Sequence, residues 1–122
     1  MESRKKARSN IELESSSKIL RTVPYPEAFL FFTDIGQYID ELASSLNDFC
    51  EKLKKVPLKS VEFHFERGDF EKWIRKTVGD ENLANMINKI GKSTQGEELR
   101  TTIQRMVERR LSQLEKIAET KS

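Results

Sequence analysis

Residues 92–122 constrain the fold most strongly, because they combine a helix start with a long amphipathic pattern. Thr94-Gln95-Gly96-Glu97 has the Thr-x-x-Glu spacing of a capping box, in which both side chains bond to backbone amides of the first turn. The apolar residues behind it occupy one arc of roughly 120° on a helix of about 100° per residue: Leu99, Ile103, Met106, Val107, Leu111, Leu114, Ile117 and Ala118. The sequence therefore predicts a long C-terminal helix with one buried face.

Residues 28–39 predict a short β-hairpin near the N-terminus. Ala28 to Thr33 is an apolar run rich in aromatic residues, and Asp34-Ile35-Gly36 has the composition of a turn. Gln37 to Ile39 fits an antiparallel return strand. Because each proline of Val23-Pro24-Tyr25-Pro26 disfavours helix at the residue before it, we expect the folded domain to start at Val23.

Shorter helices are expected between the hairpin and the C-terminal helix. Ser45, with Asp48 at the third helical position, begins one helix, and Pro57 stops it. Asp69 is a suitable N-cap for a helix that ends at Gly79, and Asp80 is a suitable N-cap for the helix after that corner.

Residues 60–67 fit two structures. Apolar and polar residues alternate from Val61 to Glu66, as they do in a strand. The segment also follows a proline stop and ends at Arg67-Gly68, which is typical of a helix exit, and we favour the helix. The whole pattern predicts an α+β, mostly helical fold: a short N-terminal β-hairpin packed on several α-helices, with a long amphipathic C-terminal helix.

The charge divides the chain unevenly. Residues 1–22 hold six basic and three acidic side chains, a net charge of +3, so the other residues carry −1 of the total of +2. We expect three parts: a basic, flexible N-terminal arm (residues 1–22), a small α+β core domain (residues 23–91), and a long helix (residues 92–122) that packs on the core and dimerises. A chain of 122 residues has the usual size of a single domain.

The cysteine content and the hydropathy indicate a compartment. Cys50 is the single cysteine, so it has no partner for an intramolecular disulfide and does not complete a cysteine-based zinc site. No apolar run approaches the roughly 18 residues that a membrane span needs, and Met1 to Asn10 are polar and basic. We therefore expect a cytoplasmic protein with no membrane partner.

About half of the chain, from Ala28 to Ile90, resembles a prokaryotic, largely archaeal, domain family of unknown function. The resemblance lies in an aromatic strand, a Gly turn, a Ser-Leu-x-x-Phe helix start and a Glu-Phe-His-x-x-Arg-Gly-Asp-Phe-x-x-Trp-Ile block. In this chain these pieces are Phe29 to Phe32, Gly36, Ser45 to Phe49, and Glu62 to Ile74, followed by Gly79-Asp80-Glu81 and Leu83-Ala84. The resemblance implies membership of that family and no particular activity.

His64 is the single histidine and the first residue to test for catalysis. A general base needs a nucleophile or a metal beside it, and the sequence contains no Gly-x-Ser-x-Gly, His-x-x-x-His or clustered carboxylate motif. An enzyme that uses His64 with Asp69 or Glu62 would need His64 to be accessible in a cleft. We favour a structural role for His64 and predict no catalytic residue, no metal site and no cofactor.

The charge asymmetry motivates the first functional hypothesis. Basic side chains of the arm and of the C-terminal helix are suited to clamp phosphates without reading sequence: Arg4, Lys5, Lys6, Arg8, Arg105, Arg109 and Lys116. We therefore expect a non-catalytic small factor that binds RNA or a ribonucleoprotein. A ribosome-associated regulator acting as a dimer is one form of this hypothesis.

A protein-interaction or adaptor module is the alternative. The apolar arc of the C-terminal helix is wide, and a domain of this size has limited surface with which to cover it. A partner, or a second copy in a homodimer, would then contact the remaining face through Ile103, Val107, Leu111 and Leu114. An exposed edge of the hairpin is a second docking surface under this hypothesis.

Overall fold

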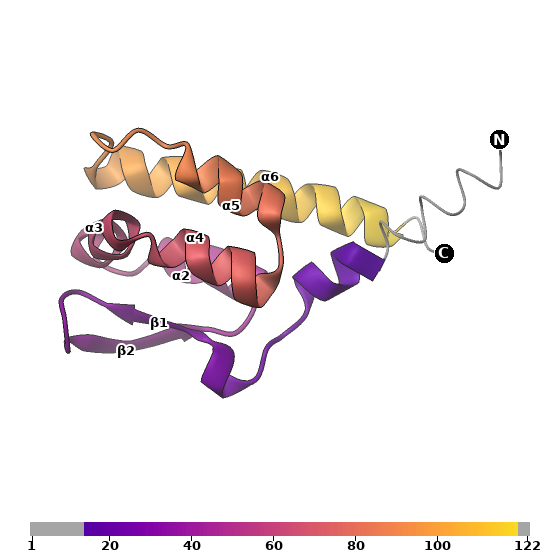
Figure 1. Cartoon of the computed structure of the whole chain (residues 1–122), viewed down its shortest axis with the longest axis horizontal. Coiled ribbons are helices and arrows are strands. Elements are labelled where there is room, and N and C mark those ends of the chain that lie inside the picture. Colours follow the sequence, from indigo (N-terminus) through magenta and orange to yellow (C-terminus); the bar gives the residue numbers. More distant parts are fainter. Residues whose placement is uncertain (1–13, 120–122) are drawn as a thin grey trace, which may run out of the picture.

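Helices dominate the computed structural model, which describes residues 14–119 (Figure 1). Residues 14–20 are helical and lead to a short 3₁₀ turn, η1 (Tyr25–Glu27). The hairpin strands β1 (Phe29–Phe32) and β2 (Tyr38–Ala43) follow. The remaining elements are helical: α2 (Leu46–Leu53), α3 (Leu58–Arg67), α4 (Asp69–Trp73), the π-helical η2 (Ile74–Val78), α5 (Glu81–Asn88) and α6 (Gly96–Glu119). The mostly helical α+β class is confirmed.

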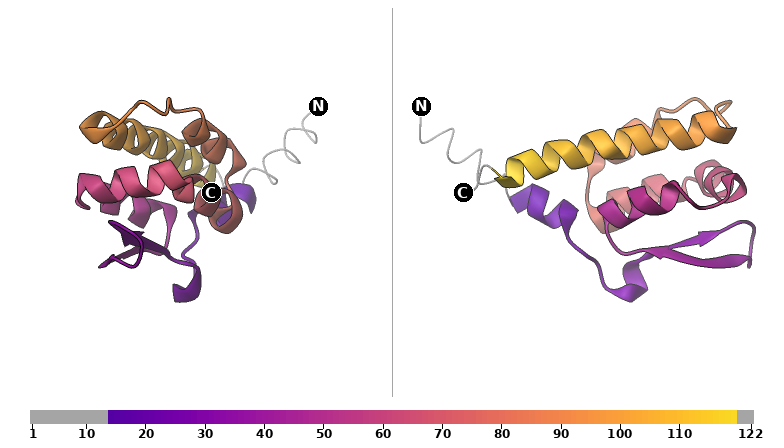
Figure 2. Two further views of the ribbon diagram at one scale, coloured as in Figure 1. Left: turned by 60° about the vertical axis from the view of Figure 1, so that its left-hand side comes forward. Right: turned by 180° about the vertical axis from the view of Figure 1, so that it is seen from behind.

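The elements form three layers (Figure 1). The hairpin is one outer layer, α2, α3 and α4 form the middle layer, and α5 and α6 form the other outer layer. The view from behind shows that α6 runs the length of the molecule and that residues 14–20 lie beside its C-terminal part (Figure 2). Both described chain ends therefore lie at the end of the molecule opposite the hairpin turn.

An aromatic cluster joins the hairpin to the middle layer. Alternate residues of a strand face opposite sides of the sheet, so Phe29 and Phe31 are buried while Leu30 and Phe32 face outward. The Phe29 ring lies 5.3 Å from the Phe70 ring and 5.6 Å from the Trp73 ring, and Trp73 Nε1 donates to the carbonyl of Glu27 at 2.8 Å. Each such buried ring contributes about 1.5–3 kcal/mol of transfer free energy.

The return strand differs from the predicted one. Its bounds are Tyr38–Ala43 rather than residues 37–39, and its pairing with β1 is antiparallel, with Phe29 opposite Ala43 and Phe32 opposite Tyr38. The register shifts between Leu30 and Phe32, because β2 has extra residues there and Asp40 adopts a positive φ of 59°. Two adjacent charged residues within β2 interrupt the alternation of apolar and polar residues by which a strand is recognised in a sequence.

Most of the predicted helix signals operate as expected. Ser45 Oγ accepts a hydrogen bond of 3.0 Å from the amide of Asp48 at the start of α2, and Asp80 Oδ1 accepts one of 3.2 Å from the amide of Leu83 at the start of α5. The helix alternative for residues 60–67 is confirmed, since they lie within α3, which ends at Gly68 with a left-handed φ of 73°.

Two helix starts differ from the prediction. Asp69 is not an N-cap, because its carboxylate instead accepts hydrogen bonds from the side chains of His64 and Arg67. The long helix begins at Gly96, one residue later than the capping box predicts, and the Gly96 amide donates to Glu62 Oε2 of α3 at 2.7 Å. In both cases a tertiary contact replaces the local cap.

The folded part begins before Val23. Ile19 belongs to the hydrophobic core, and the guanidinium of Arg21 donates to the carbonyls of Thr77 at 2.7 Å and Val78 at 3.2 Å. Residues 14–22, which the sequence assigns to the arm, therefore pack against the end of η2. The sequence offers few apolar residues there, so this docking was not anticipated.

Candidate functional site

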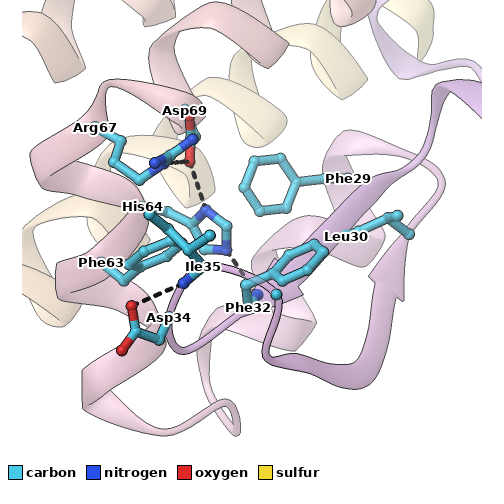
Figure 3. A pocket seen from close by; sticks show the side chains of 10 residues that line it. Phe29, Leu30, Phe32, Asp34, Ile35, Phe63, His64, Arg67 and Asp69 are labelled. Atoms are coloured by element: carbon cyan, nitrogen blue, oxygen red, sulfur yellow. Dashed lines mark hydrogen bonds and ion pairs between the residues drawn. The ribbon is translucent and has the colours of Figure 1, made fainter.

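A pocket of about 440 Å³ lies between the hairpin and α3 (Figure 3). The strand β1 and the following turn line one side, and the C-terminal part of α3 with the first residue of α4 lines the other. The lining is largely apolar and aromatic but includes an imidazole, a guanidinium and two carboxylates: Phe29, Leu30, Phe32, Asp34, Ile35, Gly36, Phe63, His64, Arg67 and Asp69. An apolar pocket with a few convergent polar groups is the usual form of a ligand site.

His64 links three elements at the back of this pocket. Its side chain is only 4% exposed. Nε2 accepts a hydrogen bond of 2.8 Å from the amide of Phe32 in β1, and Nδ1 lies 2.8 Å from Oδ2 of Asp69 in α4. Because α3 carries the imidazole, one side chain ties the hairpin to two helices.

These bonds define the protonation state of His64. A nitrogen that accepts an N–H bond has no proton of its own, so Nδ1 carries the proton and donates it to Asp69. Burial lowers the pKa of His64, while the hydrogen bond to Asp69 opposes that effect, and Arg67 also lowers this pKa. The imidazole is therefore neutral at pH 7, and a role as general base would require Nε2 to release the Phe32 amide.

Arg67 lies at the mouth of the pocket with part of its guanidinium unused. Its side chain is 52% exposed, and its Nε donates to Asp69 Oδ2 at 3.1 Å. The guanidinium carbon lies 5.1 Å from the centroid of the Phe63 ring, which is cation–π distance. Among the described residues, the terminal nitrogens of Arg67 make no hydrogen bond or ion pair.

The predicted nucleic-acid residues fall into two groups. Arg105, Arg109 and Lys116 are exposed along the outer side of α6. Arg4, Lys5, Lys6 and Arg8 lie outside the described residues. The structure thus describes only those residues of the predicted basic surface that belong to α6.

The predicted docking residues of α6 are not on the surface. Ile103, Val107, Leu111 and Leu114 are between 0% and 6% exposed and belong to the hydrophobic core of a single copy. Their assignment to a partner or dimer interface was wrong, because α2, α3 and α5 pack against α6 and these four residues lie in the core, while Met106, Ile117 and Ala118 of the same arc are only partly buried. The prediction underestimated how much of the α6 surface this small domain buries.

The pocket itself was not predicted as a site. The aromatic run of the hairpin and the Glu62 to Ile74 block are separate features of the sequence, and only the fold of α3 against β1 brings them together. Two negative findings concern residues 14–119. No group of three or more His, Cys, Asp or Glu side chains there is arranged to hold a metal ion, and no helix there is long and apolar enough to cross a bilayer.

Comparisons with known proteins identify the family and nothing narrower. No curated protein and no solved structure gives a significant match to the chain. One family model, described as "Family of unknown function (DUF5752)", matches residues 26–122. The match includes the hairpin, the pocket and the whole of α6, and the chain belongs to this family of unknown function, DUF5752.

Proposed function

We propose that the protein is a non-catalytic factor that binds RNA or a ribonucleoprotein through the basic stripe of α6, defined as Arg105, Arg109 and Lys116. The observation that carries the proposal is that these exposed side chains take part in none of the ion pairs of residues 14–119. Exposed cations without internal partners are available to contact phosphates.

The other arginines of α6 provide a comparison on the same helix. Arg100 pairs with Glu97 at 3.1 Å and also donates to the carbonyl of Leu53, while Arg110 pairs with Asp80 at 2.6 Å. These two side chains hold α6 against the core. The basic stripe makes no such contact, so the fold does not account for its charge.

The position of residues 14–20 supports a joint surface with the N-terminal arm. These residues lie beside the C-terminal part of α6, where Lys116 is located (Figures 1 and 2). Arg8 precedes Glu14 by only six residues in the sequence. The described residues of the arm therefore meet the fold at the end that carries Lys116, and the proposal includes Arg4, Lys5, Lys6 and Arg8 as further phosphate contacts.

The same proposal includes a location and an organism group. A lone, buried Cys50 suits a reducing compartment, so we infer a cytoplasmic protein. We retain an archaeal origin and a ribosomal partner as parts of this proposal. If a homodimer forms, it must use a surface other than the buried face of α6.

Filter binding with RNA extracted from ribosomes, measured over a range of salt concentrations, tests the proposal. Each phosphate contact to a single strand adds about 0.7 to the slope of log affinity against log salt, so replacing the three stripe residues with Gln should reduce the slope by about 2. Deleting residues 1–10 should reduce the slope further.

The matched control replaces Lys55, Lys59 and Lys89 with Gln, which removes the same charge from exposed positions outside the stripe. This variant should bind RNA nearly as tightly as the unmodified protein. An equal loss in both triple variants would indicate attraction to net charge alone. Such a result, or binding without salt dependence, would refute the proposed surface.

A further inference from the structure

The pocket between the hairpin and α3 plays no part in the proposed RNA binding, and its lining exposes apolar side chains. Ile35, at the tip of the turn, is 78% exposed although it lines the pocket, and Leu30 and Phe32 face outward from β1. The ring of Phe63 forms the opposite wall. A ligand that covers these surfaces gains about 25 cal/mol for each Å² of apolar area removed from water.

The polar groups at the mouth of the pocket differ in how far the fold already uses them, since one oxygen of each carboxylate is hydrogen-bonded. Asp69 Oδ2 already accepts hydrogen bonds from His64 and Arg67, and Asp34 Oδ1 accepts one of 2.8 Å from the amide of Ile35 in its own turn. The close-up shows both carboxylates engaged in this way (Figure 3). Arg67, in contrast, uses one of its five N–H donors within the described residues.

The free donors of Arg67 are also held in position. Asp69 binds one edge of the guanidinium, and Phe63 lies beneath it at 5.1 Å. A guanidinium fixed in this way presents its remaining edge for a bidentate contact, which matches the two oxygens of a carboxylate. The lining carries two carboxylates and one guanidinium, and the free edge of Arg67 is the part of it that can bind an anion next to an apolar body.

We propose that this pocket binds a ligand in which a carboxylate is attached to an apolar group. A small aromatic or aliphatic acid has this chemistry, and so does the C-terminal Leu or Phe of a polypeptide. The apolar group lies between Phe32, Ile35 and Phe63, and the carboxylate accepts from the terminal nitrogens of Arg67. His64 does not contact the ligand in this arrangement but holds β1 against α3.

Titrations of the full-length protein with three related probes test the proposal. The probes are hydrocinnamate, its primary amide and phenylpropylamine, which share an apolar body and carry negative, neutral and positive ends. Backbone amide signals of Ile35 and Gly36 in ¹H–¹⁵N spectra report binding at the pocket. We expect saturable shifts with hydrocinnamate and binding at least about tenfold weaker with the amide and the amine.

Two variants separate the pocket from general effects of charge. Arg67→Gln should remove the preference for the acid over the amide, whereas Arg75→Gln should retain it, since Arg75 pairs with Glu71 outside the pocket. Ile35→Asp adds a charge at an exposed position, so the fold should survive while hydrocinnamate binding is lost. Equal binding of the three probes, or an unchanged preference in Arg67→Gln, would overturn the proposal.

A second pair of probes distinguishes the sources of the carboxylate. Acetyl-Leu-Phe with a free C-terminus is compared with the same dipeptide as its amide. Tighter binding of the free dipeptide than of hydrocinnamate supports a polypeptide C-terminus, and the reverse order supports a small acid. Absence of saturable shifts with both acids contradicts the proposal, whether or not the protein binds RNA.

Discussion

The amide of Phe32 donates a 2.8 Å hydrogen bond to Nε2 of His64, a residue 32 positions later in the chain. This bond satisfies an amide on the side of β1 that faces away from β2. The unpaired edge of a two-stranded sheet would otherwise expose that donor. The single histidine of the protein therefore connects the hairpin to the helical layer. Protonation of Nε2 would remove the acceptor and break this hydrogen bond.

The first prediction concerns the pH dependence of stability. Burial lowers the pKa of His64 below its ordinary value of 6.5, so the unfolded chain binds more protons near and just below that pH. The contribution of His64 to stability is thus complete above pH 6.5 and is lost as the pH falls through the lowered pKa. Urea denaturation of the wild type should show this decrease.

His64→Gln is the control for this prediction. Its side-chain oxygen is able to accept from Phe32 without titrating, so the free energy of unfolding should lose the pH-dependent part while decreasing by about 1–3 kcal/mol at neutral pH. The same slope in both proteins between pH 7 and pH 5 would contradict the assignment of the neutral imidazole.

The second prediction concerns the ion pair of Asp80 and Arg110. Asp80 is 1% exposed, its Oδ2 lies 2.6 Å from Arg110 Nε, and its Oδ1 caps α5. Arg110→Met should lower the free energy of unfolding by about 3 kcal/mol, because a buried carboxylate loses its partner. Arg109→Met, one residue away on the exposed side, should change the stability little. Equal effects of the two substitutions would argue against a structural ion pair.

The third prediction separates a core residue from an interface residue. Ile103 is fully buried within one copy, so Ile103→Ala should cost about 2–5 kcal/mol by leaving a cavity. Because the contact lies within a single chain, this loss and the thermal midpoint should not depend on protein concentration. A midpoint that rises with concentration in the wild type but not in the variant would restore Ile103 to an interface.

The fourth prediction concerns the thiol of Cys50. Burial is the main reason that the pKa of this thiol is raised to about 11, with Glu108 adding to the effect. The thiolate is the reactive form, so Cys50 should react with Ellman's reagent very slowly in the native protein at pH 8. The reaction should accelerate in proportion to the unfolded fraction as urea is added. Rapid labelling without urea would show that the α2 side of the core opens.

Local signals predicted the fold well where one segment contains the whole signal. The Ser45 and Asp80 caps and the apolar arc of α6 are examples, because each depends on residues within one or two turns. Asp69 was misassigned because its competing partners, His64 and Arg67, become neighbours only after Gly68 turns the chain.

The candidate sites differ in the same way. The exposed basic stripe follows from helical spacing alone, so it was predictable from the sequence. The pocket needs β1 and α3 to meet, and no local pattern encodes that contact. The core position of Ile103 and Leu111 likewise depends on how three other helices cover α6.

The central claim is that the protein binds RNA or a ribonucleoprotein, and sedimentation of a native lysate through a density gradient tests it most directly. The gradient is run at low and at high salt, with and without nuclease, and each fraction is probed for the protein. We expect co-migration with ribosomal or other RNA-containing particles that high salt or nuclease abolishes. Migration at the same position under all conditions, as a free protein or in a nuclease-resistant complex, would contradict it.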